Sequence, residues 1–155
     1  MTDGIQIALA ASRFNHFIVE QLVDGAQDAL ARQNLPESSR PLFWVPGAYE
    51  LPLLADRLAR TGRFDAVIAL GAVIRGGTPH FDFVAGECSA GLGRVALDRD
   101  LPVIMGVLTT DTVEQALERA GTGEGNKGFD AAVTALETLE TLRVIGDRYP
   151  ANPAP

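Results

Sequence analysis

One segment near the middle of the chain, AVIALGAVIRGGTPH at residues 66–80, carries the strongest structural signal in the sequence. Its first seven residues, 66–72, are apolar or glycine and include β-branched side chains, which is typical of a strand buried on both faces. The residues that follow, 73–79, contain two glycines and a proline and predict an irregular segment. A helix is expected next, over residues 81–97, so this stretch predicts a strand, a loop and a helix in that order.

The same alternation of strand and helix extends to both sides of this segment. Parallel strands need long crossover connections, and helices in those crossovers cover both faces of the sheet. The sequence therefore predicts a three-layer α/β/α sandwich with a doubly wound, four-stranded, mainly parallel sheet of the flavodoxin-like kind. The expected strands are 5–10, 42–45, 66–72 and 102–108, and the expected helices are 17–33, 49–60, 81–97, 112–120 and 128–144.

Length and composition indicate one domain spanning residues 1–155, because 155 residues of which 46% are hydrophobic can bury one core but not two. The tail after about residue 148 is expected to be flexible. No apolar run approaches the roughly 20 residues that a membrane-spanning helix needs. The first residues, MTDG, carry no basic region before an apolar segment, so no signal peptide is predicted and the cytoplasm is the expected location.

Cysteine, histidine and charge content narrow the function classes further. The single cysteine, Cys88, excludes internal disulfides and thiolate metal clusters, and it agrees with a reducing compartment. The only histidines are His16 and His80, so no metal site is predicted. The net charge is −7 and no stripe of Lys or Arg is present, so nucleic acid is not an expected partner.

Four polar or glycine-rich loops follow the predicted strands. In open parallel sheets, ligands bind beyond the carboxyl ends of the strands, where such loops gather. We therefore expect a binding site for a small polar ligand at this edge of the sheet. The four loops are residues 12–15, 46–50, 74–80 and 109–112.

The loop after the third predicted strand contains Gly76, Gly77 and Thr78 immediately before a helix. Backbone N–H groups at a helix N-terminus can bind an anion such as phosphate. The spacing from Gly71 resembles a P-loop, but Gly77 stands where the phosphate-binding lysine belongs, which excludes an ATPase of that kind. The alternative is that the two glycines only turn the chain.

His80 lies at the start of the predicted helix over residues 81–97. Dipoles of the nearby N–H groups disfavour the charged imidazolium there, and a neutral imidazole is suited to proton transfer. His80 is therefore the candidate catalytic residue. The alternative is a histidine that caps the helix.

Other candidates have equally plain structural alternatives. Phe14 and Asn15 combine an aromatic face with an amide, which suits a polar heterocycle, although Phe14 could also belong to the core. Glu50 could bind substrate or simply favour the dipole of the following helix. Arg119 and Lys127 flank a glycine-rich loop that could hold an anion, although each could also be an ordinary solvated surface charge.

Taken together, these motifs resemble the lumazine synthase family over almost the whole chain. The resemblance implies a 6,7-dimethyl-8-ribityllumazine synthase activity, a transferase reaction in riboflavin biosynthesis. It would condense 5-amino-6-ribitylaminouracil with 3,4-dihydroxy-2-butanone 4-phosphate, with no cofactor. The motifs are SRFN at 12–15, VPGAYE at 45–50, GAVIRGGTPHF at 71–81, RAGT at 119–122 and GNKG at 125–128.

The resemblance also implies a role for each site residue. His80 would move protons, Phe14 would stack on the pyrimidine, and Lys127 would bind the uracil edge. Arg119 would hold the phosphate together with two residues of the glycine-rich loop, Gly77 and Thr78. The remaining substrate contacts would come from Asn15, Gly47, Ala48, Tyr49, Glu50, Ala72, Val73, Ile74, Met105 and Gly106.

The resemblance further implies a homo-oligomer built on pentamers, with active sites between adjacent subunits. Arg119 and Lys127 would then come from the neighbouring subunit, and the glycine-rich helix over residues 81–97 would line the five-fold axis. Riboflavin synthase is a candidate protein partner. Pentamer, decamer and larger shell all stay open as final assemblies.

Two other functions compete with the condensation. A riboflavin synthase of similar fold dismutates two lumazines and needs no phosphate clamp. The presence of Gly77, Thr78 and His80 together with Arg119 therefore favours the condensation. A flavin- or lumazine-binding paralogue would keep the pocket but lack turnover. The presence of His80, Arg119 and Lys127 argues against this second alternative.

Overall fold

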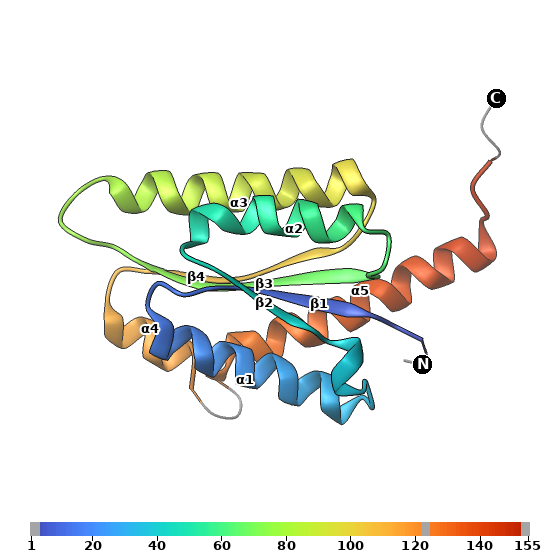
Figure 1. Ribbon diagram of the computed structural model, residues 1–155, viewed down its shortest axis with the longest axis horizontal. Helices are drawn as coiled ribbons and strands as arrows, with labels where there is room; N and C mark the ends of the chain where they lie inside the picture. Colours follow the sequence, from blue (N-terminus) through green and yellow to red (C-terminus); the bar gives the residue numbers. More distant parts are fainter. Residues whose placement is uncertain (1–3, 122–124, 153–155) are drawn as a thin grey trace.

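The computed structural model describes residues 4–121 and 125–152, which form a single four-stranded sheet with helices on both faces (Figure 1). The strands are β1 (Ile7–Ser12), β2 (Leu42–Val45), β3 (Ala66–Ile74) and β4 (Val103–Thr110). Their order is β2-β1-β3-β4, and each neighbouring pair is parallel. The predicted fold class is confirmed.

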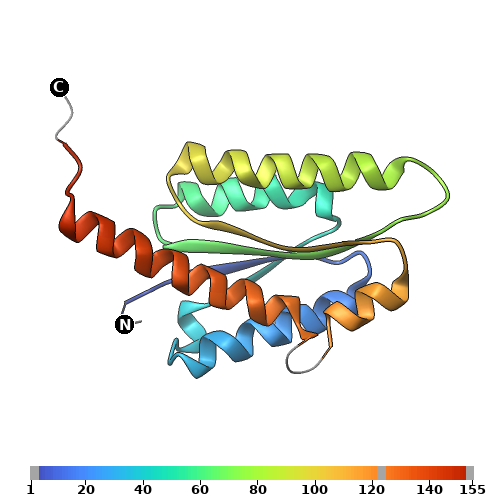
Figure 2. The same ribbon diagram turned by 180° about the vertical axis from the view of Figure 1, so that it is seen from behind.

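The helices form two layers, one on each face of the sheet (Figures 1 and 2). One layer contains α1 (His16–Arg32), α4 (Val113–Arg119) and α5 (Lys127–Arg148). The other contains α2 (Leu51–Arg60) and α3 (His80–Arg99), and two short 3-10 helices, η1 (Glu37–Ser39) and η2 (Ala48–Glu50), lie beside the second strand. The second half of α5 extends past the end of the sheet in both views.

The two central strands form the middle of the core. Residues 7–11 of β1 and 66–70 of β3 are completely buried, because each strand has a neighbour on both sides and helices on both faces. Alternate side chains point to opposite faces, so Leu9 and Ile68 pack toward α1 and α5, whereas Ala10 packs toward α2 and α3. Each large side chain buried in this way contributes about 1.5–3 kcal/mol.

Strands continue further toward their carboxyl ends than predicted. The first strand was expected at 5–10 but ends at Ser12, which pairs with Val45. The irregular segment predicted from residue 73 was wrong for Val73 and Ile74, which pair with β4 as part of β3. Pairing with β2 extends β1 to Ser12, one residue beyond the apolar residues of that strand. Val73 and Ile74, by contrast, belong to the apolar run 66–74, so β3 ends where that run ends.

Two helices are also longer than predicted, with α3 reaching Arg99 and α5 reaching Arg148, whereas α2 and α4 are shorter than the predicted 49–60 and 112–120. Arg143 stabilises the last turns of α5 through ion pairs with Glu140 and Asp147 at 2.7 Å each. The flexible tail stays a prediction, and its residues 153–155 lie outside the described residues, as do residues 122–124 of the glycine-rich loop. Within the part of the chain that the structure describes, no helix is long and apolar enough to cross a bilayer.

Candidate active site

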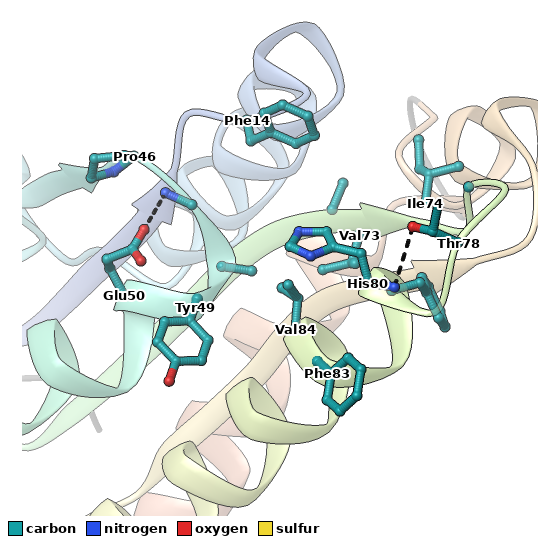
Figure 3. Close-up of a pocket in the computed structure, with 15 residues that line it drawn as sticks. Phe14, Pro46, Tyr49, Glu50, Val73, Ile74, Thr78, His80, Phe83 and Val84 are labelled. Atoms are coloured by element: carbon teal, nitrogen blue, oxygen red, sulfur yellow. Dashed lines mark hydrogen bonds between the residues drawn. The ribbon is translucent and has the colours of Figure 1, made fainter.

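A pocket of about 760 Å³ opens at the carboxyl ends of the strands (Figure 3). The chain leaves β1 for β2 on one side and then crosses over to β3 on the other side, so the loops after β1 and β3 diverge and leave a crevice. The strand order therefore places the pocket where sequence reasoning expected a ligand. The lining residues are Phe14, Pro46, Gly47, Ala48, Tyr49, Glu50, Ala72, Val73, Ile74, Gly76, Thr78, His80, Phe81, Phe83 and Val84.

The loops after β1 and β2 are joined by backbone hydrogen bonds. The Phe14 N–H donates to the carbonyl of Pro46 at 3.0 Å. Within the second loop, the Gly47 N–H donates to Glu50 Oε1 at 2.9 Å, so the Glu50 carboxylate shapes the turn before α2 (Figure 3). These bonds give one wall of the pocket a defined backbone course.

Phe14 and Asn15 have different positions relative to this pocket. The Phe14 side chain is 71% exposed and lines the pocket, so the alternative that it belongs to the core is wrong. Asn15 adopts a left-handed backbone conformation, with φ of 61°, and its Nδ2 donates to the carbonyl of Ala72 at 2.9 Å. Asn15 therefore ties the loop after β1 to the end of β3 and holds the crevice in shape.

The glycine-rich loop between β3 and α3 forms the opposite wall. Neither Gly76 nor Gly77 adopts a positive φ, and a Cβ added to either would meet open space. The local fold therefore does not require glycine at these positions, and their effect is to leave the backbone accessible. Gly76 and Thr78 line the pocket, whereas Gly77, the predicted residue between them, does not.

His80 is the first residue of α3 and is exposed to solvent. Its backbone N–H donates to Thr78 Oγ1 at 3.5 Å, and its ring points away from α3 into the pocket (Figure 3). The described residues thus bring an imidazole, a hydroxyl and the N-terminus of a 20-residue helix to one wall of the crevice.

Arg75 anchors the glycine-rich loop at its first residue. Its Nε donates to Asp111 Oδ1 at 2.9 Å, its Nη1 lies 3.5 Å from Asp82 Oδ1, and its guanidinium lies 4.4 Å from the centroid of the Phe81 ring. The hydrogen bond to Asp111, with a further contribution from Asp82, raises the pKa of Arg75 above its usual value. The contacts connect the end of β4 with both ends of the loop.

Four of the other predicted residues line a second cavity of about 510 Å³ beside β4, which we call the β4 surface, whereas Asn15 and Gly77 line neither cavity. It contains Met105, Gly106, Arg119 and Lys127, which do not line the first pocket. Arg119 Nη1 donates to the carbonyl of Gln115 at 3.1 Å, and Lys127 Nζ lies 3.7 Å from Asp130 Oδ2. Within one chain, the predicted site residues thus form two separate groups.

Pro46 and Gly76 belong to two of the loops that were expected at the site. Sequence reasoning missed three residues of the first pocket: Phe81, Phe83 and Val84. Two of them could have been found, because residues 83 and 84 follow His80 by three and four positions and so share its face of the helix. Phe83 is 71% exposed and adds to the pocket a second phenylalanine ring of α3, besides that of Phe81.

Metal ligands and thiol chemistry receive no support from the described residues. Among them, no group of three or more His, Cys, Asp or Glu side chains could hold a metal ion. Cys88 is buried within α3, and burial raises the pKa of its thiol to about 11, so the thiolate is disfavoured at neutral pH.

Fold and pocket together define a class: flavodoxin-like α/β proteins that bind a small polar ligand at the switch point of a parallel sheet. Comparison with known proteins then identifies the family. The family model described as 6,7-dimethyl-8-ribityllumazine synthase matches residues 4–143. The chain belongs to the lumazine synthase family.

Curated relatives agree with this assignment over nearly the whole chain. A 6,7-dimethyl-8-ribityllumazine synthase of Edwardsiella ictaluri is 59% identical over 141 residues, which cover 90% of each chain. Proteins of the same name from Yersinia pestis and Yersinia pseudotuberculosis are 57% identical over 145 residues, which cover 93% of each chain.

Proposed function

We infer that the chain catalyses the reaction for which its relatives are named. It is a transferase of riboflavin biosynthesis that condenses 5-amino-6-ribitylaminouracil with 3,4-dihydroxy-2-butanone 4-phosphate, giving 6,7-dimethyl-8-ribityllumazine, phosphate and water. The observation that carries this conclusion is the pocket at the switch point, where Phe14, His80 and an open glycine-rich loop line one crevice.

The aminouracil binds against the wall formed by the loops after β1 and β2. An exposed Phe14 ring offers its face for stacking on the pyrimidine, and the backbone of residues 47–50 offers polar groups to the ring and the ribityl chain. Ala72, Val73 and Ile74, at the end of β3, form the floor of this position. Asn15 acts through its hydrogen bond to Ala72, and its amide oxygen is available to a ribityl hydroxyl.

The butanone phosphate binds at the other wall. Backbone N–H groups of residues 76–78 and the N-terminus of α3 favour an anion, and the Thr78 hydroxyl adds a donor. The fifteen described residues that line this pocket include no Lys or Arg, although the phosphate carries up to two negative charges. We assign the balancing positive charge to Arg119, which would bind the phosphate. Lys127 would bind the uracil edge.

His80 transfers protons between the two substrates. An amine of the aminouracil attacks the ketone of the butanone phosphate, and water leaves as the imine forms. Phosphate then leaves by elimination, and the enol that results becomes a ketone. The second amine of the aminouracil attacks this ketone and closes the ring with loss of a second water. Each step moves a proton to or from nitrogen or oxygen, and an imidazole at the pocket wall can accept and return it. Positioning and proton transfer are sufficient because the substrates supply both the nucleophile and the leaving group.

Assembly of the complete site requires a second copy of the chain. We assign Met105, Gly106, Arg119 and Lys127 of one subunit to the pocket of its neighbour, in a homo-oligomer built on pentamers. Support comes from their position on the β4 surface, outside the pocket of their own chain. A single domain over residues 1–155, a cytoplasmic location and riboflavin synthase as a protein partner complete the proposal.

Direct turnover tests this function. The purified protein is mixed with the aminouracil and the butanone phosphate, and lumazine formation is followed by absorbance against the uncatalysed background. We expect a rate far above background. A rate equal to background, with lumazine still bound, would instead identify a binding paralogue on the same fold.

Specificity for the phosphate separates the condensation from the dismutation catalysed by a riboflavin synthase. The protein is incubated with lumazine alone and riboflavin is measured by fluorescence. We expect no riboflavin, because the open loop before α3 is suited to a phosphate that the dismutation does not use. Riboflavin formation at a comparable rate would favour the alternative.

A further inference from the structure

Asn126 directly precedes α5, in the connection between α4 and α5. It has no part in the chemistry described above, yet it is one of few polar residues that are buried among the described residues. Asn126 is only 5% exposed. Arg119 lies seven positions before it and Lys127 directly after it, and these are the two cations of the β4 surface.

The Asn126 side chain joins three elements through hydrogen bonds. Its Oδ1 accepts from the Phe129 N–H at 2.9 Å and so caps the first turn of α5. Its Nδ2 donates to the carbonyl of Gln21 in α1 at 2.9 Å and to the carbonyl of Ala120, just after α4, at 3.3 Å. A side-chain amide supplies a carbonyl acceptor and two N–H donors in one small group, which is what these three hydrogen bonds use.

Two glycines make room for this arrangement. A Cβ added to Gly25 of α1 would fall on the Asn126 side chain, and a Cβ added to Gly128 of α5 would fall on the backbone of Leu22. The backbones of α1 and α5 therefore cross in near contact beside Asn126. The start of α5 is fixed against α1, which itself packs on the core strands.

The positions of Arg119 and Lys127 both depend on the hydrogen bonds of Asn126. Ala120, bonded by Asn126, directly follows Arg119, the last residue of α4, and a backbone bridge also pairs Ala120 with Asn126. Lys127 is the first residue of the helix that Asn126 caps. Shifting either element by about 1 Å can reduce a reaction rate as much as 10²-fold when it displaces a binding group.

We propose that Asn126 is a positioning residue that sets the relative placement of Arg119 and Lys127 for the condensation. The proposal rests on the proposed function, which assigns these two cations to the substrates. It predicts an effect on substrate binding that a loss of stability by itself would not produce, because partial unfolding removes active sites without changing the affinity of those that remain.

The most informative variant is Asn126→Asp. Aspartate keeps the acceptor that caps α5 but loses both donors to Gln21 and Ala120, so it separates positioning from helix capping. We expect the KM values for both substrates to rise about tenfold, close to the effect of Asn126→Ala. Wild-type KM values in Asn126→Asp would overturn the proposal. If this variant does not assemble, neutral Asn126→Ser, which also keeps a cap acceptor, replaces it.

A double-mutant cycle gives the decisive readout. In an Arg119→Ala background, we expect Asn126→Asp to leave the KM for the butanone phosphate unchanged but still to raise the KM for the aminouracil, through Lys127. An equal fold-change in the KM for the butanone phosphate in both backgrounds would overturn the positioning role. Leu58→Ala in α2, a buried position away from the pocket lining, is the control that lowers stability alone.

Failure of the proposed function gives a different result. A wild type without turnover, or an Arg119→Ala variant with a wild-type KM for the butanone phosphate, would overturn the assigned role of Arg119 and the inference with it. If Arg119→Ala strongly raises the KM for the butanone phosphate, but Asn126→Asp raises that KM equally in both backgrounds, only the inference about Asn126 would be overturned.

Discussion

The two concave surfaces of this chain differ in what they provide. The pocket at the switch point is built from β1, β2, β3 and α3, and it provides shape, aromatic rings, open backbone and His80. The β4 surface provides charge, because Arg119 and Lys127 lie there. Of the residues described as lining the first pocket, none is a Lys or Arg. In the proposed function, the first pocket therefore supplies the stacking ring and the backbone donors, and the β4 surface of a neighbouring chain adds the positive charge.

Position in the sheet explains the difference. The first pocket lies at the ends of β1, β2 and β3, whereas the β4 surface lies along an edge strand on which Met105 stays 42% exposed. Exposed edge strands are usually covered by another element or another chain. The exposed edge agrees with the proposed assembly, in which the β4 surface of one chain completes the pocket of its neighbour.

The largest expected effect concerns the proton-transfer group of the first pocket. His80→Ala should lower kcat about 10²–10⁴-fold, because a positioned general acid or base contributes about that much. His16→Ala, at the start of α1 and outside the pocket lining, is the matched control. Steady-state rates of lumazine formation measure both. If kcat of His80→Ala stays within about twofold of wild type, His80 does not transfer protons in the rate-limiting step, and the rate enhancement comes from substrate positioning.

The next largest effect concerns the charge of the β4 surface. Arg119→Ala should raise the KM for the butanone phosphate roughly 10–100-fold, because a hydrogen bond to a charged group contributes about 1.5–3 kcal/mol. The KM for the aminouracil should change little. Arg60→Ala, which removes an exposed arginine on α2 near Asp56, controls for net charge. Equal changes in both KM values would argue against a phosphate clamp.

Ring recognition by the first pocket should have a smaller effect. Phe14→Ala should raise the KM for the aminouracil about tenfold, because stacking of a base on an aromatic ring contributes about 1–3 kcal/mol. The melting temperature should not fall, since Phe14 is 71% exposed. Phe17→Ala is the control, because its ring is 55% exposed but does not line the pocket. A fall in melting temperature without a change in KM would indicate a packing role.

Mixed assemblies test whether the two surfaces meet across a subunit interface. Co-expressed His80→Ala and Arg119→Ala chains should form some sites that combine an intact His80 with an intact Arg119. Random mixing predicts about a quarter of the sites intact, so activity should rise several-fold above either parent. Activity equal to the average of the two parents would mean that each chain serves its own pocket.

The smallest effect concerns the anchor of the glycine-rich loop. Arg75→Ala should raise the KM for the butanone phosphate by less than about fivefold, because exposed ion pairs contribute about 0–1 kcal/mol. Arg99→Ala breaks a comparable pair with Asp56, at 2.8 Å, away from the pocket and should leave that KM unchanged. A loss as large as that of Arg119→Ala would make Arg75 a direct phosphate ligand.

Much of the fold and part of the site could be predicted from local patterns. Alternating apolar strands and amphipathic helices indicated the layers, and polar loops after the strands indicated the edge that binds ligand. The end of β3 at Ile74 coincides with the last residue of the apolar run 66–74 and could have been found from it. The strand end at Ser12 could not be predicted, because it depends on pairing with β2. The same holds for Asn15, whose bond to Ala72 joins residues 57 positions apart.

The sequence by itself determined the fold class, the family and the residue types of the site, because burial and motif spacing are local properties of the chain. Only the tertiary structure decided that Phe14 and His80 share one pocket while Arg119 and Lys127 occupy another surface. That division follows from the strand order, which places β3 inside the sheet and β4 at its edge. Strand order is set by how the crossovers pack on the whole sheet, and no single segment of sequence contains it.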